Sequence, residues 1–287
     1  NLGTSRYAAK GGELNRLAHD LLAIDPKRPE PWVAVALWHD LRGEHEKALG
    51  YVDKALELGP RHVLAHTLRG DVLLTLKRPE LAIVSYFKAK EFRKDLRSYR
   101  GLVQAYLGSR KLREALVTAK EANANLHNSA GAVALLGRVL AFPSTSSADK
   151  ERAAALFGKA LRMDPNCVDA SLALVDLHLH AKQLDKCAEV LQASLARHNL
   201  DFLHSKLADV LTLQGRHSDA LASYHTALSL DPESADAKAG LDRLEKLMRG
   251  VDPDAATGDE DEDHTDATND ESDPNNGPGS FEGSQYM

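Results

Sequence analysis

The sequence has few cysteines and few aromatic residues. Two cysteines, Cys167 and Cys187, occur in 287 residues, which argues against a disulfide scaffold and fits a reducing compartment. Zinc fingers and RING-type sites need several Cys or His ligands at short spacings, and two isolated cysteines cannot supply them. Aromatic residues make up only 5% of the chain, whereas alanine and leucine are abundant. This composition favours helices packed through small side chains over strands, which prefer β-branched and aromatic residues.

The sequence also lacks the short motifs of catalysis. It contains no GxxxxGK[ST] or GxGxxG phosphate loop and no GxSxG nucleophile motif. The best histidine pair, His178 and His180, is spaced by two residues, which on a helix turns the rings about 200° apart and prevents them from chelating one ion. We therefore predict that the chain is not an enzyme and has no catalytic residue, no metal site and no cofactor.

Long apolar stretches are missing as well. No uninterrupted apolar run approaches the roughly 18 residues of a membrane-spanning helix, and the start of the sequence has no apolar signal-peptide core. We therefore expect a soluble, intracellular protein without a membrane partner. The chain begins with Asn1 rather than methionine, and we expect it to be a fragment or a processed form.

Basic residues are absent from the end of the sequence. Residues 252–287 hold twelve acidic side chains and no Lys or Arg, so that the net charge of −6 hides a body, residues 1–251, of about +6. This positive charge is dilute and interleaved with acids, and we expect no nucleic-acid partner. The end segment is too polar to fold and is predicted to be a disordered, solubilising tail. Two alternatives stay open: an acidic ligand for a basic partner surface, or phosphorylation at Thr257 and Thr268.

What the sequence does contain is a recurring pair of small residues. Seven positions correspond to two helical turns, so both members of a pair lie on one face of a helix, where a second helix can approach closely. Successive pairs are 33 to 38 residues apart, a period that indicates a solenoid of helix hairpins. In this interpretation Cys187 is a buried small residue. The pairs are Ala48/Ala55, Ala82/Ala89, Ala115/Ala122, Ala153/Ala160, Cys187/Ser194 and Ala220/Ala227.

A partner helix is predicted before each pair. Residues 29–43 read PEPWVAVALWHDLRG, in which prolines stand at the start, apolar residues recur at helical spacing and glycine ends the run. The fourth unit carries about four extra residues around the turn-rich PSTSS at 143–147, which we expect to lengthen the turn between its two helices. Prolines that stop the second helix follow at Pro60, Pro165 and Pro232.

Trp32, Gly70 and Tyr106, together with the small-residue pairs and the closing prolines, match the signature of tetratricopeptide repeats. We predict an all-α fold, a right-handed superhelical solenoid of tetratricopeptide helix pairs with a disordered acidic C-terminal tail. The predicted parts are an incomplete N-terminal repeat with only its second helix at 1–28, six repeats at 29–232, a capping helix at 233–251 and the acidic tail at 252–287.

Solenoids of this kind present their first helices on a concave face, where peptides or helices bind. The candidate groove contacts are Asp71, Arg100 and Gln104, with simple solvation of these side chains as the alternative. Chaperone-binding relatives use a clamp of Lys, Asn and Arg on these helices. The corresponding positions here include Val33 and Thr67, which disfavours a cochaperone role.

Three stretches carry a more specific resemblance. RPEPWVAVALWHDLRGEHEKAL, DLRSYRGLVQAYLGSRKLREAL and AGLDRLEKLMRGVDPDA, together with the lengthened fourth unit, resemble the subunit 7 family of the anaphase-promoting complex in a form like that of plants. The resemblance runs from about residue 13 to about residue 262. It implies a non-catalytic scaffold subunit of a multisubunit ubiquitin ligase that controls mitotic progression through protein–protein binding.

The resemblance also implies partners. These are the other tetratricopeptide subunits of the ligase, with a coactivator as a further candidate, in the nucleus and cytoplasm. The resemblance implies a homodimer formed through N-terminal repeats, which we expect this sequence to lack, so dimerisation of this chain stays open. The alternative function is a generic tetratricopeptide adaptor that binds peptide segments in another complex.

Overall fold

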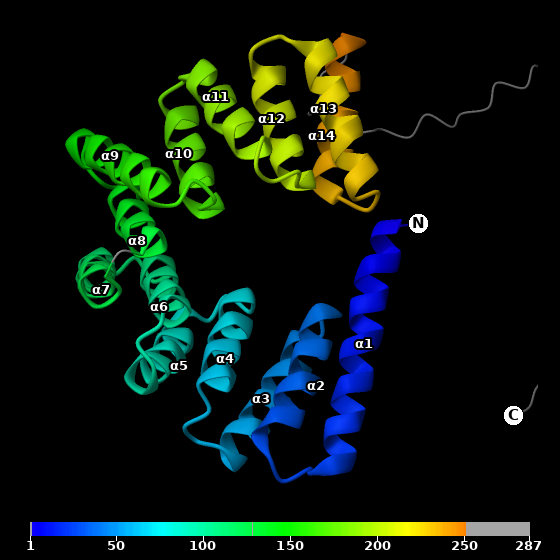
Figure 1. Cartoon of the computed structure of the whole chain (residues 1–287), viewed down its shortest axis with the longest axis vertical. Coiled ribbons are helices and arrows are strands. Elements are labelled where there is room, and N and C mark those ends of the chain that lie inside the picture. Colours follow the sequence, from blue (N-terminus) through cyan, green and yellow to red (C-terminus); the bar gives the residue numbers. More distant parts are fainter. Residues whose placement is uncertain (1, 128, 251–287) are drawn as a thin grey trace, which may run out of the picture. The chain divides into compact units, whose positions relative to one another are not determined.

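The computed structural model describes residues 2–127 and 129–250. These residues form fourteen α-helices and no strand (Figure 1). The predicted all-α solenoid is therefore confirmed for this part of the chain. The predicted acidic tail at 252–287 and its disorder lie outside the described residues.

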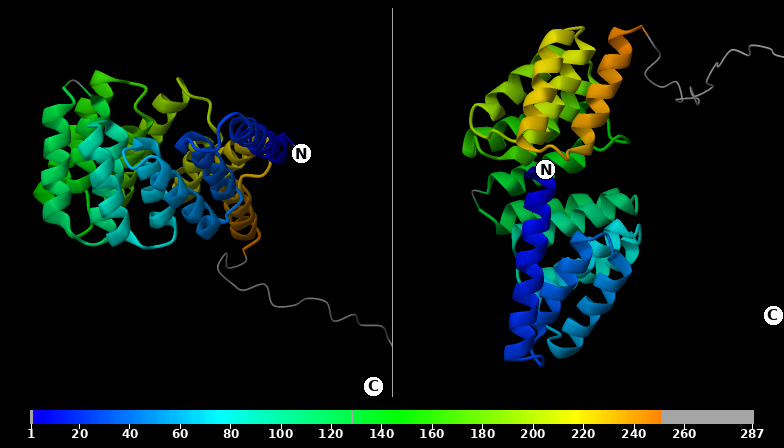
Figure 2. Two further views of the ribbon diagram at one scale, coloured as in Figure 1. Left: turned by 90° about the horizontal axis from the view of Figure 1, so that it is seen from below. Right: turned by 90° about the vertical axis from the view of Figure 1, so that its right-hand side faces the viewer.

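The helices form successive hairpins that lie side by side in a curved row (Figures 1 and 2). Each first helix packs against its second helix, and the contacts α2–α4, α4–α6, α6–α8 and α8–α10 join the first helices of neighbouring hairpins. The first helices are α2 (Pro29–Leu41), α4 (Val63–Thr75), α6 (Leu96–Gly108), α8 (Ala130–Leu140), α10 (Val168–His180) and α12 (Asp201–Leu213). The second helices are α3 (His45–Leu58), α5 (Pro79–Phe92), α7 (Leu112–Asn125), α9 (Ser147–Met163), α11 (Leu184–Leu195) and α13 (His217–Leu230). Before and after them lie α1 (Leu2–Ile24) and α14 (Ala235–Met248).

The small-residue pairs lie in the core, as the sequence predicts. All of their members are 0% exposed, except Ser194 at 5%. Large side chains such as Tyr86, Phe157 and Tyr224 are buried next to them and fill the space beside each close helix contact. The sequence pattern therefore marks the packing surface of every second helix from α3 to α13.

Five hairpins share one short turn, which has three residues between its helices. The middle residue of each has a positive φ, between 55° and 75°. Glycine adopts this left-handed conformation freely, whereas other residues are strained by about 1 kcal/mol. The sequence marks only two of the five turns with glycine. The middle residues are Gly43, Lys77, Arg110, Lys182 and Gly215.

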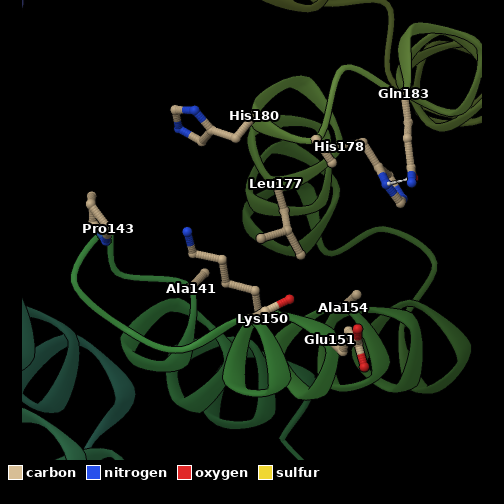
Figure 3. Close-up of a pocket in the computed structure, with 11 residues that line it drawn as sticks. Ala141, Pro143, Lys150, Glu151, Ala154, Leu177, His178, His180 and Gln183 are labelled. Carbon is tan, nitrogen blue, oxygen red and sulfur yellow. Dashed lines mark hydrogen bonds between the residues drawn. The ribbon is translucent and has the colours of Figure 1, made fainter.

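The α8–α9 hairpin differs from the others. Its turn spans residues 141–146, so the predicted lengthening is confirmed. Part of the insertion also joins α9, which begins six residues before Ala153, whereas the other second helices begin three residues before their first small residue. Figure 3 shows the turn, with Pro143 on it, beside the part of α10 that carries Leu177.

At the end of the row, α14 packs against α12 and α13. Its buried residues Ala237, Gly240 and Leu244 are three and four positions apart and form one stripe. No helix within residues 2–127 and 129–250 combines the length and the apolar character that crossing a bilayer requires. The division into six repeats, a half repeat and a cap stays a prediction.

Candidate functional site

Polar side chains gather around the first helix α6. Arg97, Arg100 and Gln104 are three and four positions apart, so they project from one face of α6. Asp71 on α4 and Asp169 on α10 each form an ion pair with an arginine of this face. We call these five residues the α6 polar stripe. It combines all three predicted groove contacts with two residues that were not predicted.

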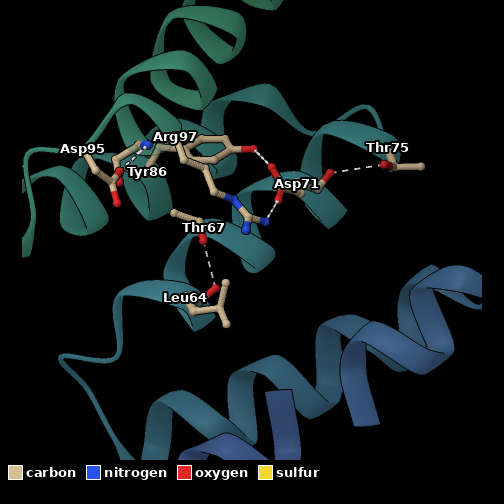
Figure 4. Close-up of polar contacts among 8 residues, drawn as sticks. Leu64, Thr67, Asp71, Thr75, Tyr86, Asp95 and Arg97 are labelled. Atoms are coloured by element: carbon tan, nitrogen blue, oxygen red, sulfur yellow. Dashed lines mark hydrogen bonds and ion pairs between the residues drawn. The ribbon is translucent and has the colours of Figure 1, made fainter. Parts of the chain in front are cut away.

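The carboxylate of Asp71 is held from two sides. The Tyr86 hydroxyl on α5 donates a hydrogen bond to Oδ1, and Arg97 Nη2 lies 2.8 Å from Oδ2 (Figure 4). Burial and the neighbouring Asp71 charge raise the pKa of Tyr86 well above its ordinary value of 10. Asp71 therefore joins α4, α5 and α6 and acts first as a structural anchor. Its side chain is still 42% exposed, so a partner can reach it.

A second ion pair reaches across one hairpin. Arg100 on α6 pairs with Asp169 on α10, although α8 lies between these helices in the row. The pair passes the beginning of α8 at Gly131, where a Cβ atom would overlap the Leu96 side chain. The two charged side chains are 39% and 43% exposed. The pair therefore links hairpins two steps apart and remains accessible to solvent.

A surface pocket of about 590 Å³ lies beside this ion pair. Leu96, Met163 and Cys167 contribute apolar wall, while Arg100, Asp164 and Asp169 contribute charges. Burial raises the pKa of the Cys167 thiol, so the nucleophilic thiolate is disfavoured at neutral pH. A pocket that combines apolar wall with several polar and charged groups can hold the side chain of a bound peptide. It offers binding rather than covalent chemistry.

Gln104 is the free member of the stripe. Its side chain is exposed and forms no hydrogen bond with another residue of the described ranges. Arg97 could have been found from the sequence, because it lies one helical turn before Arg100 on the same face. Asp169 could not have been found from the sequence, because it is 69 residues from Arg100 and its position depends on how the hairpins stack.

The other cysteines and histidines considered in the sequence lie outside the α6 polar stripe. Among the described residues, no group of three His, Cys, Asp or Glu side chains could hold a metal ion. Cys187 is fully buried, as predicted, and burial raises the pKa of its thiol. His178 Nδ1 lies 3.0 Å from the side-chain oxygen of Gln183, while the exposed His180 ring points in another direction (Figure 3).

Comparison with known proteins supports this description of the fold. Tetratricopeptide repeat families match residues 42–95, 147–208 and 203–238. The crystal structure of the APC/C hetero-tetramer Cut9–Hcn1 aligns with a TM-score of 0.58 over 83% of this chain and 46% of that chain, at 18% identity. At this identity the likeness shows the fold alone.

Proteins similar in sequence give a more specific comparison than the fold does. Anaphase-promoting complex subunit 7 of Arabidopsis thaliana is 41% identical over 84% of this chain and 43% of its own length. The Dictyostelium discoideum protein of the same name is 34% identical over 84% of this chain and 41% of its own length. The Homo sapiens protein is 29% identical over 91% of this chain and 45% of its own length.

The chain thus spans less than half the length of these relatives. The resemblance inferred from the sequence is confirmed, and it covers the hairpins that carry the α6 polar stripe. The chain belongs to the tetratricopeptide repeat family and, within that family, is similar to anaphase-promoting complex subunit 7.

Proposed function

We propose that this chain is a non-catalytic scaffold subunit of the anaphase-promoting complex, a multisubunit ubiquitin ligase that controls mitotic progression. The observation that carries the proposal is the 41% identity to the Arabidopsis thaliana subunit 7 along 84% of the chain. The described helices support it, because a row of hairpins exposes a large binding surface on a rigid frame. In this role the chain supplies geometry and binding area, and other subunits carry out ubiquitin transfer.

The proposed partners are the other tetratricopeptide subunits of the complex, with a coactivator as a further candidate, in the nucleus and cytoplasm. The α6 polar stripe is the proposed contact surface. Gln104 offers an unoccupied amide, and Arg100 and Asp169 are both accessible beside the 590 Å³ pocket. A partner that presents hydrogen-bonding groups can use these residues without breaking the anchor at Asp71. Dimerisation stays open.

The packing of the helices supports the proposed division of the chain. Repeats over 29–232 would hold the binding surface, and residues 233–251 would cap them, because α14 buries one stripe against the last hairpin. Residues 1–28 would form the second helix of a further repeat. In the described part of this segment, α1 packs against α2 and Ala18 is 3% exposed.

The scaffold proposal is tested by purifying the tagged 287-residue chain from dividing cells and measuring the recovered proteins by quantitative mass spectrometry. We expect enrichment of the anaphase-promoting complex subunits. Recovery of none of them, from cells in which the complex itself is intact, would contradict the proposal.

The contact surface is tested by two matched variants. Arg100→Glu combined with Gln104→Lys changes the stripe, and Lys88→Glu changes an exposed position on the second helix α5. We expect the stripe variant to lose subunits that the Lys88→Glu variant retains. Equal recovery of subunits by both variants would show that the stripe is not part of the interface and that other surfaces carry the scaffold role.

A second function is favoured by the pocket beside Arg100 and Asp169. A generic adaptor would use this pocket for a peptide segment in another complex. Saturable binding of a terminal peptide from such a complex to the purified chain, without recovery of any ligase subunit from cells, would support the adaptor instead.

A further inference from the structure

The lengthened α8–α9 turn forms one wall of a second surface pocket, with a volume of about 570 Å³. The turn contributes Ala141 and Pro143, the first half of α9 continues this wall, and the end of α10 lies across the pocket from them (Figure 3). Each of the other hairpins between residues 29 and 230 has a turn of three residues. The insertion therefore gives this hairpin a wall that the other hairpins lack.

The pocket has an apolar floor made of short and branched side chains. Ala154 on α9 and Leu177 and Ala181 around the end of α10 line it. Ala154 and Leu177 are partly buried against the core of the hairpin, so they are held in place by packing. Such a floor favours methylene groups over a fully hydrated ligand.

One end of the pocket carries positive charge without an internal partner. Lys150 is half-buried and points toward His180 and Pro143, whereas the Glu151 carboxylate lies on the other side of the Lys150 backbone (Figure 3). No ion pair to Lys150 is formed within the described parts of the chain. The neighbouring Asp149 is already engaged by Arg152, 3.4 Å away.

The two histidines line opposite sides of the pocket (Figure 3). Gln183 holds the His178 ring through Nδ1, at 3.0 Å, so the ring is fixed at the pocket wall. The exposed His180 ring lines the same pocket, on the side toward which the Lys150 side chain is directed (Figure 3). A carboxylate placed between Lys150 and His180 would accept hydrogen bonds from an ammonium and an imidazole while its aliphatic stem lies on Leu177.

We propose that this pocket binds an acidic peptide segment of a partner protein, with a glutamate side chain seated on Lys150 and His180. Glutamate fits because its two methylene groups can cover the apolar floor while its charge reaches the ammonium. A peptide fits better than a free inorganic anion, because the pocket is open at its exposed rim and larger than a single anion. This site is separate from the α6 polar stripe and does not depend on the complex to which the chain belongs.

The test uses fluorescent peptides with the core Leu-Glu-Leu, Leu-Gln-Leu or Leu-Lys-Leu between glycines, titrated against the full 287-residue chain. Fluorescence anisotropy measures affinity, and the ring resonances of His178 and His180 report the location. We expect saturable binding of the glutamate peptide with a larger shift at the His180 ring than at the His178 ring. The glutamine peptide should bind up to about fivefold more weakly, which is the upper end of the range for an accessible ion pair.

Reversing the charge of Lys150 distinguishes a loss of binding from a loss of folding, because a folded variant should change its preference between the glutamate and lysine peptides. The Lys150→Glu variant should bind the glutamate peptide at least about fivefold more weakly than the native chain does. It should bind the lysine peptide better than the native chain does. Lys159→Glu makes the same change at an exposed position of α9 that does not line the pocket, and it should leave both affinities unchanged. Circular dichroism checks that both variants remain helical.

Several results would overturn the proposal. Equal binding of the glutamate and glutamine peptides would exclude charge recognition. An equal loss in Lys159→Glu, or no saturable binding of any acidic peptide, would exclude this pocket as the site. Binding of a phosphoserine peptide but not of the glutamate peptide would assign the pocket to a phosphorylated segment instead.

Discussion

The hydroxyl of Tyr224 on α13 donates a hydrogen bond of 2.6 Å to the carboxylate of Asp209 on α12. Tyr86 and Asp71 form the same interaction at the same separation of fifteen residues. Phe157 occupies the equivalent place on α9, is equally buried, and has no hydroxyl to satisfy. A buried hydroxyl needs an acceptor, and in both tyrosine hairpins an aspartate on the first helix supplies it.

The first prediction concerns this bond. Tyr224→Phe removes the donor and should lower the free energy of unfolding by about 1 kcal/mol at neutral pH. Tyr51→Phe is the control, because the Tyr51 hydroxyl has no hydrogen-bond partner among the described residues. Urea denaturation followed by circular dichroism measures both. An equal loss in the two variants would show that the hydroxyl bond does not contribute.

The stabilities of the native chain and of Tyr224→Phe should respond differently to high pH. Burial and the hydrogen bond to Asp209 raise the pKa of Tyr224 above its ordinary value of 10. A raised pKa in the folded state gives a contribution that is fully present below about pH 10 and is lost as pH rises toward the folded value. The stability advantage of the native chain over Tyr224→Phe should therefore stay constant up to about pH 9 and shrink as the pH rises above about 10. A constant difference would contradict the raised pKa.

The second prediction concerns two helical glycines. Gly70 packs so closely on the Tyr86 ring that a Cβ atom would lie 2.5 Å from Cζ, whereas nothing lies within 4 Å of a Cβ at Gly50. Gly50→Ala should stabilise the chain by about 0.5–1 kcal/mol, because alanine is the better helix former. Gly70→Ala should instead destabilise it by about 1–3 kcal/mol through overpacking. Thermal denaturation distinguishes the two, and a stabilising Gly70→Ala would contradict the tight contact.

The helices and their packing faces could be predicted from the sequence because the helical period is a local property. The pair Ala82/Ala89 shows this, since its spacing of seven is enough to place both residues in the core. The left-handed turns at Lys77, Arg110 and Lys182 could not be predicted, because these residues carry no local signal for a positive φ.

The candidate site was predicted only in part for a related reason. Arg100 and Gln104 share a face of α6 by helical geometry, which the sequence contains. The partner of Arg100 is Asp169, and this contact depends on the angle between three successive hairpins. Glycine at position 131 lets Leu96 pack closely beside this pair, and this close contact appears only after the hairpins are assembled.

The third prediction tests the small-residue packing. Ala220 is 0% exposed at the contact between α12 and α13, whereas Ala222 is exposed on the same helix. Ala220→Leu should push these helices apart and cost about 1–3 kcal/mol, and Ala222→Leu should change stability by less than about 0.5 kcal/mol. Chemical denaturation of both variants measures the difference. Equal effects would mean that the close approach of the helices does not depend on the small residue.

The last prediction concerns the ion pair between Arg100 and Asp169. Because both side chains are more than one-third exposed, solvent screens the pair, and its coupling energy should be about 0.2–1 kcal/mol at low salt. A double-mutant cycle with Arg100→Ala and Asp169→Ala measures this energy by urea denaturation. In 1 M NaCl the Debye length falls to about 3 Å, so most of the coupling should disappear. A coupling that is zero at low salt would show that the pair does not join α6 to α10 in solution. A coupling that persists in high salt would show that Leu96 and the beginning of α8 shield the pair from solvent, in which case a partner could not reach Arg100 without first opening the groove.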